Sequence, residues 1–437
     1  MQVIRCKTLF LSFLNTSRLE YQTLTFTMNQ FIPKSFFTLI LALFVIGCTN
    51  VFANASDKES GLVWTGSWAT APQLVEPNNM PPKPGLTNNT FRQIVRVSLG
   101  GKTVRLRFTN LFSKSALTLN SVSIAISTEG SNIVKKTSKF LRFEGKKCVT
   151  LLPNTELTSD PLAFNLSSGS RLAITICYGD VPQDLSGHPG SRTTSYLLTG
   201  KKSPKADFSK AVTTDHWYTI NRVEVLAPKT AGTIAILGNS IADGRGSGVN
   251  KQNRWPDLLS DRLLQNESTK QRAVLNLGIG GNCVLRGGLG QTALKRFDRD
   301  ILSQNNVKWL IVSIGINDIG GCRSSEAGTK VAQDLIDAYA QFIAKAHAQG
   351  IKVYGAPVLP FGRSFYDADY RQPAWVTVNN WIRTSGQFDA VIDFEPAMRN
   401  PEIPNSLLPD VHDGDWLHPN QLGYRKMAEA IDLKLFE

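Results

Sequence analysis

Serine, histidine and aspartate residues that could together perform acyl transfer stand at two places in this 437-residue sequence. Asp415 precedes His418 by three residues, so one short turn could carry both side chains. Ser240 stands much earlier, in the segment GNSIADG. A serine hydroxyl is a weak nucleophile at neutral pH, so a histidine must accept its proton and a carboxylate must hold that histidine in the correct tautomer. We therefore predict Ser240 as a nucleophile, His418 as its base and Asp415 as the orienting acid.

The negatively charged oxygen that forms during acyl transfer needs hydrogen-bond donors, and two further segments could supply them. Residues 276–282 (NLGIGGN) follow one predicted strand, and residues 315–318 (GIND) follow another. The candidate donors are the backbone N–H groups of Ser240 and Gly281 and the side-chain amide of Asn317. Losing one such donor typically costs about 3 kcal/mol of transition-state stabilisation. We therefore predict an oxyanion hole built from Ser240, Gly281 and Asn317.

The elements that must position these residues are apolar strands alternating with amphipathic helices, a pattern that begins after Pro228. One helix is expected where Val331, Leu335 and Tyr339 share an apolar stripe that ends near Gly350. Such alternation predicts an α/β fold with a parallel sheet, helices on both faces, and ligands bound beyond the carboxyl ends of the strands. The expected strands cover residues 233–237, 273–277, 309–314, 353–357 and 391–394.

Residues 62–228 have a different hydrophobic pattern. Short runs in which apolar and polar residues alternate are separated by turn-forming residues. This pattern predicts an all-β sandwich domain with antiparallel strands. Residues 95–99 and 104–108 each alternate apolar and polar side chains, and Gly100–Gly101 between them is typical of a hairpin turn. We therefore expect a sandwich accessory domain over residues 62–228 and a catalytic domain over residues 232–437.

Four segments taken together resemble the sequence blocks of the SGNH, or GDSL-type, family of esterases and lipases. In chain order they are GNSIADG, NLGIGGN, GIND and DGDWLHPN. Each block alone is a weak signal, but their order after the expected strands is specific. The resemblance covers roughly residues 232–437 and implies a flavodoxin-like parallel sheet. It also implies Ser240 as the nucleophile, Ser240, Gly281 and Asn317 as oxyanion donors, and Asp415 and His418 as the activating pair.

The resemblance further implies a reaction, the hydrolysis of carboxylic esters through an acyl-serine intermediate. A sandwich that opens with TGSWATAPQ ahead of these blocks resembles exported bacterial and fungal acylhydrolases, whose substrates include acetylated polysaccharides, short-chain esters and lipids. Because no long apolar lid segment stands out, we expect small acyl groups, such as acetyl on a carbohydrate. One alternative is a lipase or acyltransferase of the same family. Another is a carbohydrate- or surface-binding protein with an inactive hydrolase domain, in which Trp64, Trp68 and Trp217 would stack on sugars.

Other interpretations of the same residues fit the sequence less well. An α/β-hydrolase places its acid and its histidine on separate loops, whereas here they are three residues apart. A dinucleotide site would need a third glycine where Cys283 stands. His412 and Asp413 are rivals of His418 and Asp415 for the two activating roles. His412 has no acid three residues before it, so we favour His418 with Asp415.

Three residues within the four segments leave alternatives open. The family usually has an aspartate directly before the nucleophile, where this chain has Asn239. This difference raises the hypothesis that the chain is an inactive relative of the family. Asp318 could steady the loop that carries Asn317, or it could simply begin a turn. Trp416 could line a substrate pocket or pack into the interior.

The N-terminus has the features of a signal peptide. Residues 35–47 form an apolar run that follows a lysine and precedes small residues at 53–55. We therefore expect residues 1–55 to be a signal-peptide region whose true start is Met28, and the mature protein to be secreted or periplasmic. Membrane attachment is expected only if Cys48 is a lipidated cysteine.

Composition limits the partners and cofactors. The formal charge is +13, but the basic residues are scattered and form no nucleic-acid-binding signature, so we expect no nucleic acid partner. No metal-ligand motif of the His-Glu-x-x-His kind occurs, so we expect no metal and no other cofactor, and the expected partner is a small-molecule or carbohydrate ester. Four cysteines follow residue 55, and a bond between Cys283 and Cys322 would brace the loops after the oxyanion segments. Sequence cannot decide between thiols and disulfides for these residues, which are Cys148, Cys177, Cys283 and Cys322.

Overall fold

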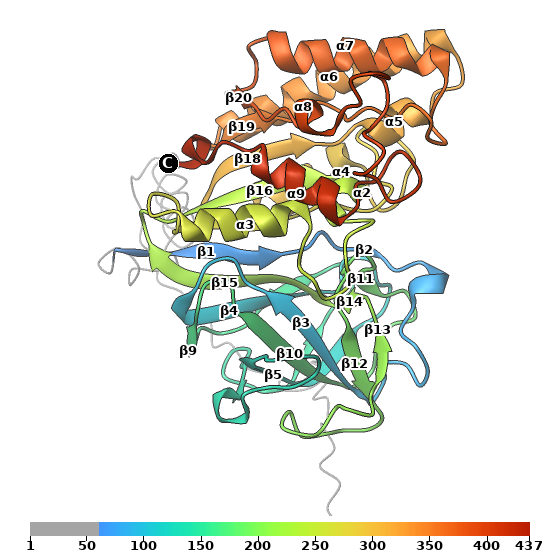
Figure 1. Cartoon of the computed structure of the whole chain (residues 1–437). Helices are drawn as coiled ribbons and strands as arrows, with labels where there is room; N and C mark the ends of the chain where they lie inside the picture. Colours follow the sequence, from blue (N-terminus) through green and yellow to red (C-terminus); the bar gives the residue numbers. More distant parts are fainter. Residues whose placement is uncertain (1–60) are drawn as a thin grey trace, which may run out of the picture. The chain divides into compact units, whose positions relative to one another are not determined.

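A five-stranded parallel sheet carries the candidate residues in the computed structural model, which describes residues 61–437 (Figure 1). The predicted signal peptide, with Met28 and Cys48, lies outside the described residues. The sheet order is β17-β16-β18-β19-β20, which is the flavodoxin-like arrangement that we predicted. The connections from β16 and β18 diverge, and ligands of such sheets bind at this switch point. The strands are β16 (Gly232–Gly238), β17 (Arg272–Asn276), β18 (Val307–Ser313), β19 (Lys352–Gly355) and β20 (Ala390–Val391).

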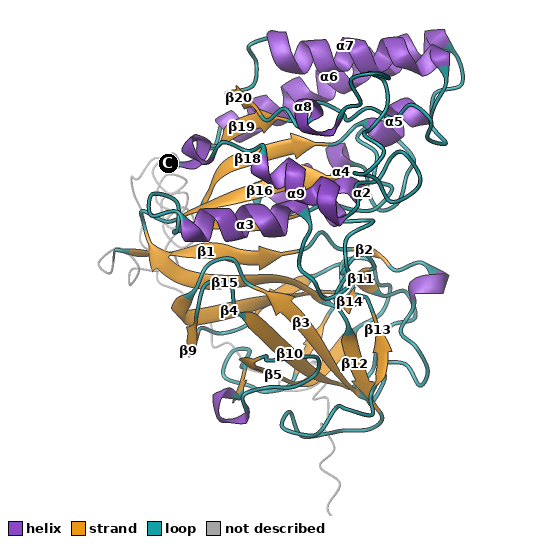
Figure 2. Ribbon diagram, in the orientation of Figure 1, coloured by secondary structure: helices purple, strands orange, loops and turns teal. Residues whose placement is uncertain are grey.

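Helices cover both faces of this sheet, which also confirms the predicted fold class (Figure 2). Successive side chains of a strand point to opposite faces, so Ala235 and Leu237 of β16 pack with one set of helices and Ile234 and Ile236 with the other. None of the helices in residues 61–437 combines the length and the hydrophobicity needed to cross a bilayer. The first set includes α4 (Ala293–Phe297), α5 (Ile316–Gly320), α6 (Ser325–His347) and α7 (Gln372–Thr384); the second includes α2 (Ser240–Asp243), α3 (Trp255–Gln265), α8 (Glu395–Met398) and α9 (Gln421–Glu429).

Antiparallel sheets precede the parallel sheet, and they enclose a separate hydrophobic core. One sheet has the order β1-β15-β4-β8 with β9 beside β4, and a second has the order β13-β12-β3-β10-β5-β6 with β7 beside β5. A third, small sheet has the order β14-β11-β2. The strands are β1 (Leu62–Ala69), β2 (Gln73–Leu74), β3 (Thr90–Arg96), β4 (Gly101–Thr109), β5 (Leu117–Ile126), β6 (Lys139–Phe140), β7 (Val149–Leu151), β8 (Glu156–Thr158), β9 (Leu162–Leu166), β10 (Arg171–Tyr178), β11 (Ser186–His188), β12 (Ser195–Leu198), β13 (Val212–Thr214), β14 (Trp217–Tyr218) and β15 (Ile220–Pro228).

The hairpin predicted around Gly100–Gly101 is wrong. β3 pairs with β10 and β12, whereas β4 pairs with β15, β8 and β9, so the two strands belong to different sheets. The backbone N–H of Val97 bonds to the carbonyl of Ser170, and that of Ser98 bonds to Ser67, which leaves neither for a partner across the turn. The two glycines therefore carry the chain from one sheet to the other. The apolar face was predicted correctly, because Val95, Val97, Leu99, Val104, Leu106 and Phe108 are all buried.

The antiparallel part and the parallel sheet pack directly on each other, within a single compact unit that includes all the described residues. Strand β1 lies against β17, and the hydroxyl of Ser98 accepts a hydrogen bond from the backbone N–H of Val274 at 3.0 Å. Ala69 and Ala71 belong to the hydrophobic cluster of the parallel sheet, and Ala273 of β17 belongs to the cluster of the antiparallel part. Each part thus completes the core of the other.

Candidate active site

Ser240 begins helix α2 immediately after β16 ends. A side chain at Gly238 would overlap the Cβ of Ala242, so glycine is required for the chain to turn this sharply. Asn239 caps the helix, since its Oδ1 accepts a hydrogen bond from the backbone N–H of Ile241 at 2.9 Å. The aspartate usual at this position would offer the same acceptor. The departure at Asn239 therefore keeps the cap that holds Ser240 at the start of the helix.

The three residues of the predicted nucleophile, base and acid lie in hydrogen-bond contact. Ser240 Oγ is 2.9 Å from Nε2 of His418, and Nδ1 of the same ring is 2.6 Å from Asp415 Oδ2. Asp415 Oδ1 accepts hydrogen bonds from the backbone N–H groups of Leu417 and His418, at 3.0 and 2.9 Å. Residues 415–418 thus form one turn. In it the Asp415 carboxylate accepts hydrogen bonds from the backbone and also contacts the imidazole of His418. In this arrangement Nδ1 carries the proton and Nε2 is left to accept one.

Burial and charge set the protonation of this pair. Burial lowers the pKa of His418 below its usual 6.5, and the contact with Asp415 opposes that shift only in part. Burial acts to raise the pKa of Asp415, but hydrogen bonds from the His418 side chain and the backbone outweigh it, and the net shift is downward. At neutral pH the imidazole is therefore neutral and the carboxylate ionised. A neutral imidazole is the form that can accept a proton from a serine hydroxyl.

Asn317 lies at the start of α5, directly after β18, with its carboxamide fixed at both ends. Its Nδ2 donates to the backbone carbonyl of Asn282 at 2.8 Å, and its Oδ1 accepts from the hydroxyl of Tyr366 at 3.1 Å. A carboxamide nitrogen has two N–H groups, so one of them remains for another acceptor. The carbonyl of Asn282 sets the orientation of the amide, because a flipped amide would place its oxygen against a carbonyl that cannot donate, and the Tyr366 hydroxyl supports the same orientation as a second contact.

Gly281 occupies a turn that only a glycine adopts easily. The backbone N–H of Asn282 bonds to the carbonyl of Ile279 at 3.2 Å, and Gly281 has a φ of +67°, which is typical of the third position of a type II turn. The preceding residue, Gly280, donates its N–H to Asp243 Oδ2 at 2.9 Å. Within the described residues, the backbone N–H groups of Ser240 and Gly281 have no hydrogen-bond acceptor. Both are therefore available to a ligand oxygen.

Asp318 steadies the loop that carries the oxyanion segments, which decides between its two interpretations. The carboxylate is buried and accepts hydrogen bonds from the backbone N–H groups of Val284 and Leu285, at 2.9 and 3.0 Å. Burial raises its pKa to about 6. It therefore joins the segment after Gly281 to the segment that carries Asn317.

Tyr366 is a site residue that the sequence did not reveal. It lies 49 residues after Asn317, in a loop beyond β19, and no motif includes it. A side chain at Gly320 would overlap the ring of Tyr366, but only the structure shows this contact.

His412 and Asp413, the alternative candidates for the base and the acid, make different contacts. His412 Nδ1 accepts hydrogen bonds from the backbone N–H groups of Gly414 and Trp416, at 3.1 and 3.2 Å. No hydrogen bond joins the Asp413 carboxylate to His418 anywhere in residues 61–437. Trp416 has a φ of +58°, and its ring lies between the His412 ring, 4.1 Å away, and the guanidinium of Arg363, 4.8 Å away. Trp416 is half-buried beside the pair, stacked on both neighbours.

The tryptophans suggested as sugar-stacking residues are mostly interior. Trp68 and Trp217 are 6% and 2% exposed, and their rings meet edge to face at 4.9 Å. Neither offers a face to a ligand. Trp64 is partly exposed, and the guanidinium of Arg105 covers its ring at 4.1 Å.

Cys283 and Cys322 are buried thiols and form no disulfide with each other, so the suggested brace is wrong. The Sγ of Cys322 lies 3.6 Å from the carbonyl of Asp318 and 3.7 Å from that of Ala327. Burial raises the pKa of Cys283 to about 12, so it stays protonated. Among residues 61–437 no group of three or more histidine, cysteine, aspartate or glutamate side chains could hold a metal ion.

A cavity of about 410 Å³ opens beside Asn317. Two exposed arginines, Arg286 and Arg323, line this cavity together with apolar side chains and glycines. It is lined by Cys283, Leu285, Arg286, Gly287, Gly288, Asn317, Asp318, Gly321, Cys322, Arg323, Ala327 and Val331.

Part of the chain matches a family model. Residues 236–426 match the family model described as GDSL-like lipase/acylhydrolase, which confirms the resemblance predicted from the four segments. No curated protein gives a significant match to the chain.

Several solved structures are similar over the same part of the chain. An acetyl xylan esterase from Geobacillus stearothermophilus is 19% identical with a TM-score of 0.36, over 48% of this chain and 98% of that one. A psychrotrophic esterase from Pseudoalteromonas sp. is 19% identical with a TM-score of 0.34, over 46% of this chain and 93% of that one. A GDSL-like lipase from Bacteroides thetaiotaomicron is 20% identical with a TM-score of 0.33, over 47% of this chain and 87% of that one.

Proposed function

We propose that this chain, whose residues 236–426 form a domain of the GDSL-like lipase/acylhydrolase family, is a carboxylic ester hydrolase with an acyl-Ser240 intermediate. The observation that carries the proposal is the hydrogen-bonded series Ser240 Oγ, His418 and Asp415, at 2.9 and 2.6 Å. A neutral imidazole with its lone pair on the serine and its N–H on a carboxylate is the arrangement that general-base catalysis needs.

In the first half of the proposed reaction, Ser240 Oγ attacks the ester carbonyl carbon while its proton passes to His418 Nε2. The carbonyl oxygen becomes negative and accepts hydrogen bonds from the N–H groups of Ser240 and Gly281 and from the remaining N–H of Asn317. The bond to the alcohol oxygen then breaks, and His418 returns the proton to that oxygen. The alcohol leaves, and the acyl group stays on Ser240.

In the second half, a water molecule replaces the alcohol. His418 Nε2 accepts a proton from the water as its oxygen attacks the acyl carbon. When the tetrahedral intermediate collapses, the bond to Ser240 Oγ breaks and that oxygen recovers the proton. The products are a carboxylic acid and the resting enzyme, and Asp415 remains ionised throughout.

The substrate that we propose has a short acyl group, such as acetyl, on a polar alcohol such as a carbohydrate. The cavity of about 410 Å³ beside Asn317 supports this choice, because Arg286 and Arg323 line it. A long alkyl chain laid over two guanidinium groups would remove them from water without a compensating partner. Sugar hydroxyls could instead accept hydrogen bonds from both.

The test is ester hydrolysis by the wild type and by Ser240→Ala, with p-nitrophenyl esters from acetate to palmitate. We expect the wild type to cleave the acetate fastest and the variant to lose at least about 10³-fold in kcat, while circular dichroism of the two proteins stays identical. If the long esters were cleaved faster than the acetate, the enzyme would be a lipase. Acyl transfer to an added alcohol would indicate a transferase. A folded wild type without activity on any ester would contradict the proposal.

A further inference from the structure

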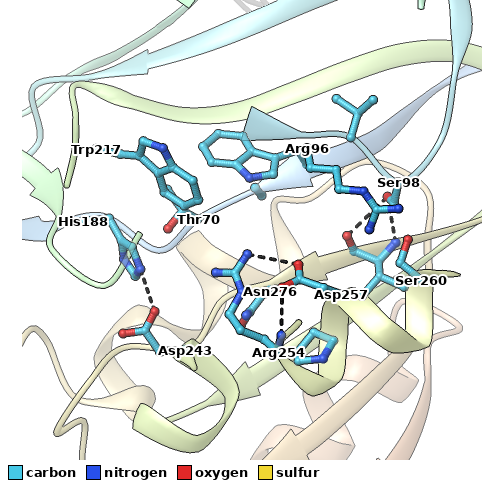
Figure 3. A pocket seen from close by; sticks show the side chains of 15 residues that line it. Thr70, Arg96, Ser98, His188, Trp217, Asp243, Arg254, Asp257, Ser260 and Asn276 are labelled. Atoms are coloured by element: carbon cyan, nitrogen blue, oxygen red, sulfur yellow. Dashed lines mark hydrogen bonds and ion pairs between the residues drawn. The ribbon is translucent and has the colours of Figure 1, made fainter. Parts of the chain in front are cut away.

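A histidine of the antiparallel part is linked, through the carboxylate of Asp243, to the loop that carries Gly281. His188 ends β11, and its ring contacts helix α2, as Figure 3 shows. Its Nδ1 lies 2.9 Å from the carbonyl oxygen of Ala71, and its Nε2 lies 2.9 Å from Oδ1 of Asp243. The side chains of His188 and Asp243 are 3% and 4% exposed. The contact is therefore an interior one between the two parts of the molecule.

The partners of His188 fix its hydrogens. A carbonyl oxygen only accepts, so Nδ1 must carry a hydrogen towards Ala71. The other nitrogen faces a carboxyl oxygen at hydrogen-bond distance, so a second hydrogen lies between Nε2 and Asp243. Asp243 Oδ2 in turn accepts the backbone N–H of Gly280 at 2.9 Å. One unbroken series of hydrogen bonds thus joins the antiparallel part to the residue directly before Gly281.

Neighbouring side chains and backbone enclose this series closely. A side chain at Gly190 would overlap the Asp243 carboxylate, so the segment after β11 closes over it. The Trp217 ring stacks on His188 at 6.0 Å, and the nearby Arg254 is paired with Asp257 at 2.7 Å.

The adjoining cavity is about 30 Å³, the volume of one or two water molecules, so it holds no ligand. A buried histidine–carboxylate pair is also weak evidence for stability, because an apolar pair of similar volume often stabilises a fold equally well. An apolar pair, however, could not accept the hydrogen bond that the N–H of Gly280 donates to Asp243.

We infer that His188 is a positioning residue of the hydrolytic site: through Asp243 it fixes Gly280, and thereby the direction of the Gly281 N–H towards the developing oxyanion. The antiparallel part is then a component of the catalytic frame. This inference rests on the proposed function, since it gives the Gly281 N–H a role in ester cleavage.

The experiment compares His188→Gln with His188→Asn, because each amide nitrogen reproduces one ring nitrogen. A glutamine NH₂ reaches the place of Nε2 and can donate to Asp243, whereas an asparagine NH₂ stands at Nδ1 and reaches only Ala71. Competent sites are counted by titration with a fluorophosphonate, and kcat and KM for p-nitrophenyl acetate are expressed per titrated site. The matched control is His216→Asn, since His216 also bonds to a carbonyl, that of Pro189 at 2.7 Å, but does not touch Asp243.

We expect His188→Asn to lower kcat by roughly 10- to 100-fold with KM nearly unchanged, since a misdirected oxyanion donor weakens only the transition state. His188→Gln should keep kcat within about threefold of the wild type, as should His216→Asn. A merely structural role would reduce the number of titrated sites and leave kcat per site unchanged. Equal kcat in the glutamine and asparagine variants would overturn the inference.

If His188→Asn does not fold, the same comparison is made at Asp243. Asp243→Asn can still accept from Gly280 and donate to a neutral His188 ring, whereas Asp243→Ala can do neither. We expect the alanine variant alone to lose kcat per site, and equal rates in the two would overturn the inference. An inactive wild type that no fluorophosphonate labels would instead be a failure of the proposed function.

Discussion

At the scale of single residues, the imidazole of His418 determines how the proposed activity depends on pH. The ring must be neutral to accept the proton of Ser240, and burial lowers its pKa from 6.5. We therefore expect kcat/KM to rise with pH, with a midpoint below 6.5, and to be constant near neutrality. Initial rates on p-nitrophenyl acetate between pH 4 and pH 8 measure this profile. A midpoint above 6.5 would contradict the burial of a neutral base.

The hydroxyl of Tyr366 is expected to matter because it orients the amide of Asn317. Removing the donor itself, in Asn317→Ala, should lower kcat by about 10²- to 10³-fold. Tyr366→Phe keeps the ring but removes one of the two hydrogen bonds that hold the amide in place, so we expect a smaller loss of roughly 10-fold in kcat with little change in KM. Tyr370→Phe is the matched control, since Tyr370 lies on the same segment and its ring packs on Arg371. Unchanged kcat in Tyr366→Phe would show that the amide holds its orientation without the phenol.

The residues that sequence could identify are those with a local signal. Asp415 and His418 share one turn, and the structure brings both to Ser240. Tyr366 and His188 could not be found in this way, because each acts on a group far along the chain and neither stands in a motif. Only the structure shows that His188 contacts Asp243.

At the scale of secondary-structure elements, Arg296 of α4 holds the ends of two strands together. This fully buried guanidinium donates to the carbonyl of Gly238 at the end of β16 at 3.1 Å, to the carbonyl of Leu277 after β17 at 2.8 Å, and to Asn282 Oδ1 at 3.1 Å. The nucleophile and the oxyanion loop therefore share one anchor, and it also pairs with Asp300 at 3.2 Å.

We expect Arg296→Met to lower the free energy of unfolding by about 3 kcal/mol, because buried carbonyl groups and the Asp300 carboxylate would lose a partner. Urea unfolding followed by fluorescence measures the change. Arg299→Met is the control: Arg299 also pairs with Asp300, at 2.6 Å, but is partly exposed, so the expected loss is below about 1 kcal/mol. Equal losses in the two variants would contradict the anchoring role.

Elements of the parallel sheet could be predicted closely, whereas strand pairing in the antiparallel part could not. Strands such as β16 are buried on both faces, so an apolar run between helices identifies them. The alternation in β3 and β4 correctly indicated which side chains are buried. Alternation reports the face of a strand and not its neighbour, however, and the partners of both strands come from distant segments.

At the scale of the whole described unit, the antiparallel part is expected to be necessary for the stability of the hydrolase part. Ala69 and Ala71 lie in the core of the parallel sheet, and β1 covers β17. A fragment of residues 232–437 would expose this apolar surface to water. We expect it to bind the dye ANS and to lose the cooperative thermal transition that a chain of residues 59–437 shows. A fragment with an equal melting temperature would contradict the shared core.

Covalent labelling of Ser240 tests the central proposal most directly. A fluorophosphonate reacts with an activated serine and leaves a phosphonyl group on its oxygen, which peptide mass spectrometry locates. We expect one label per wild-type molecule, on the peptide that contains Ser240, a much slower reaction in His418→Ala, and none in Ser240→Ala. A folded wild-type protein that stays unlabelled, or that carries the label on another residue, would contradict an acyl-Ser240 mechanism.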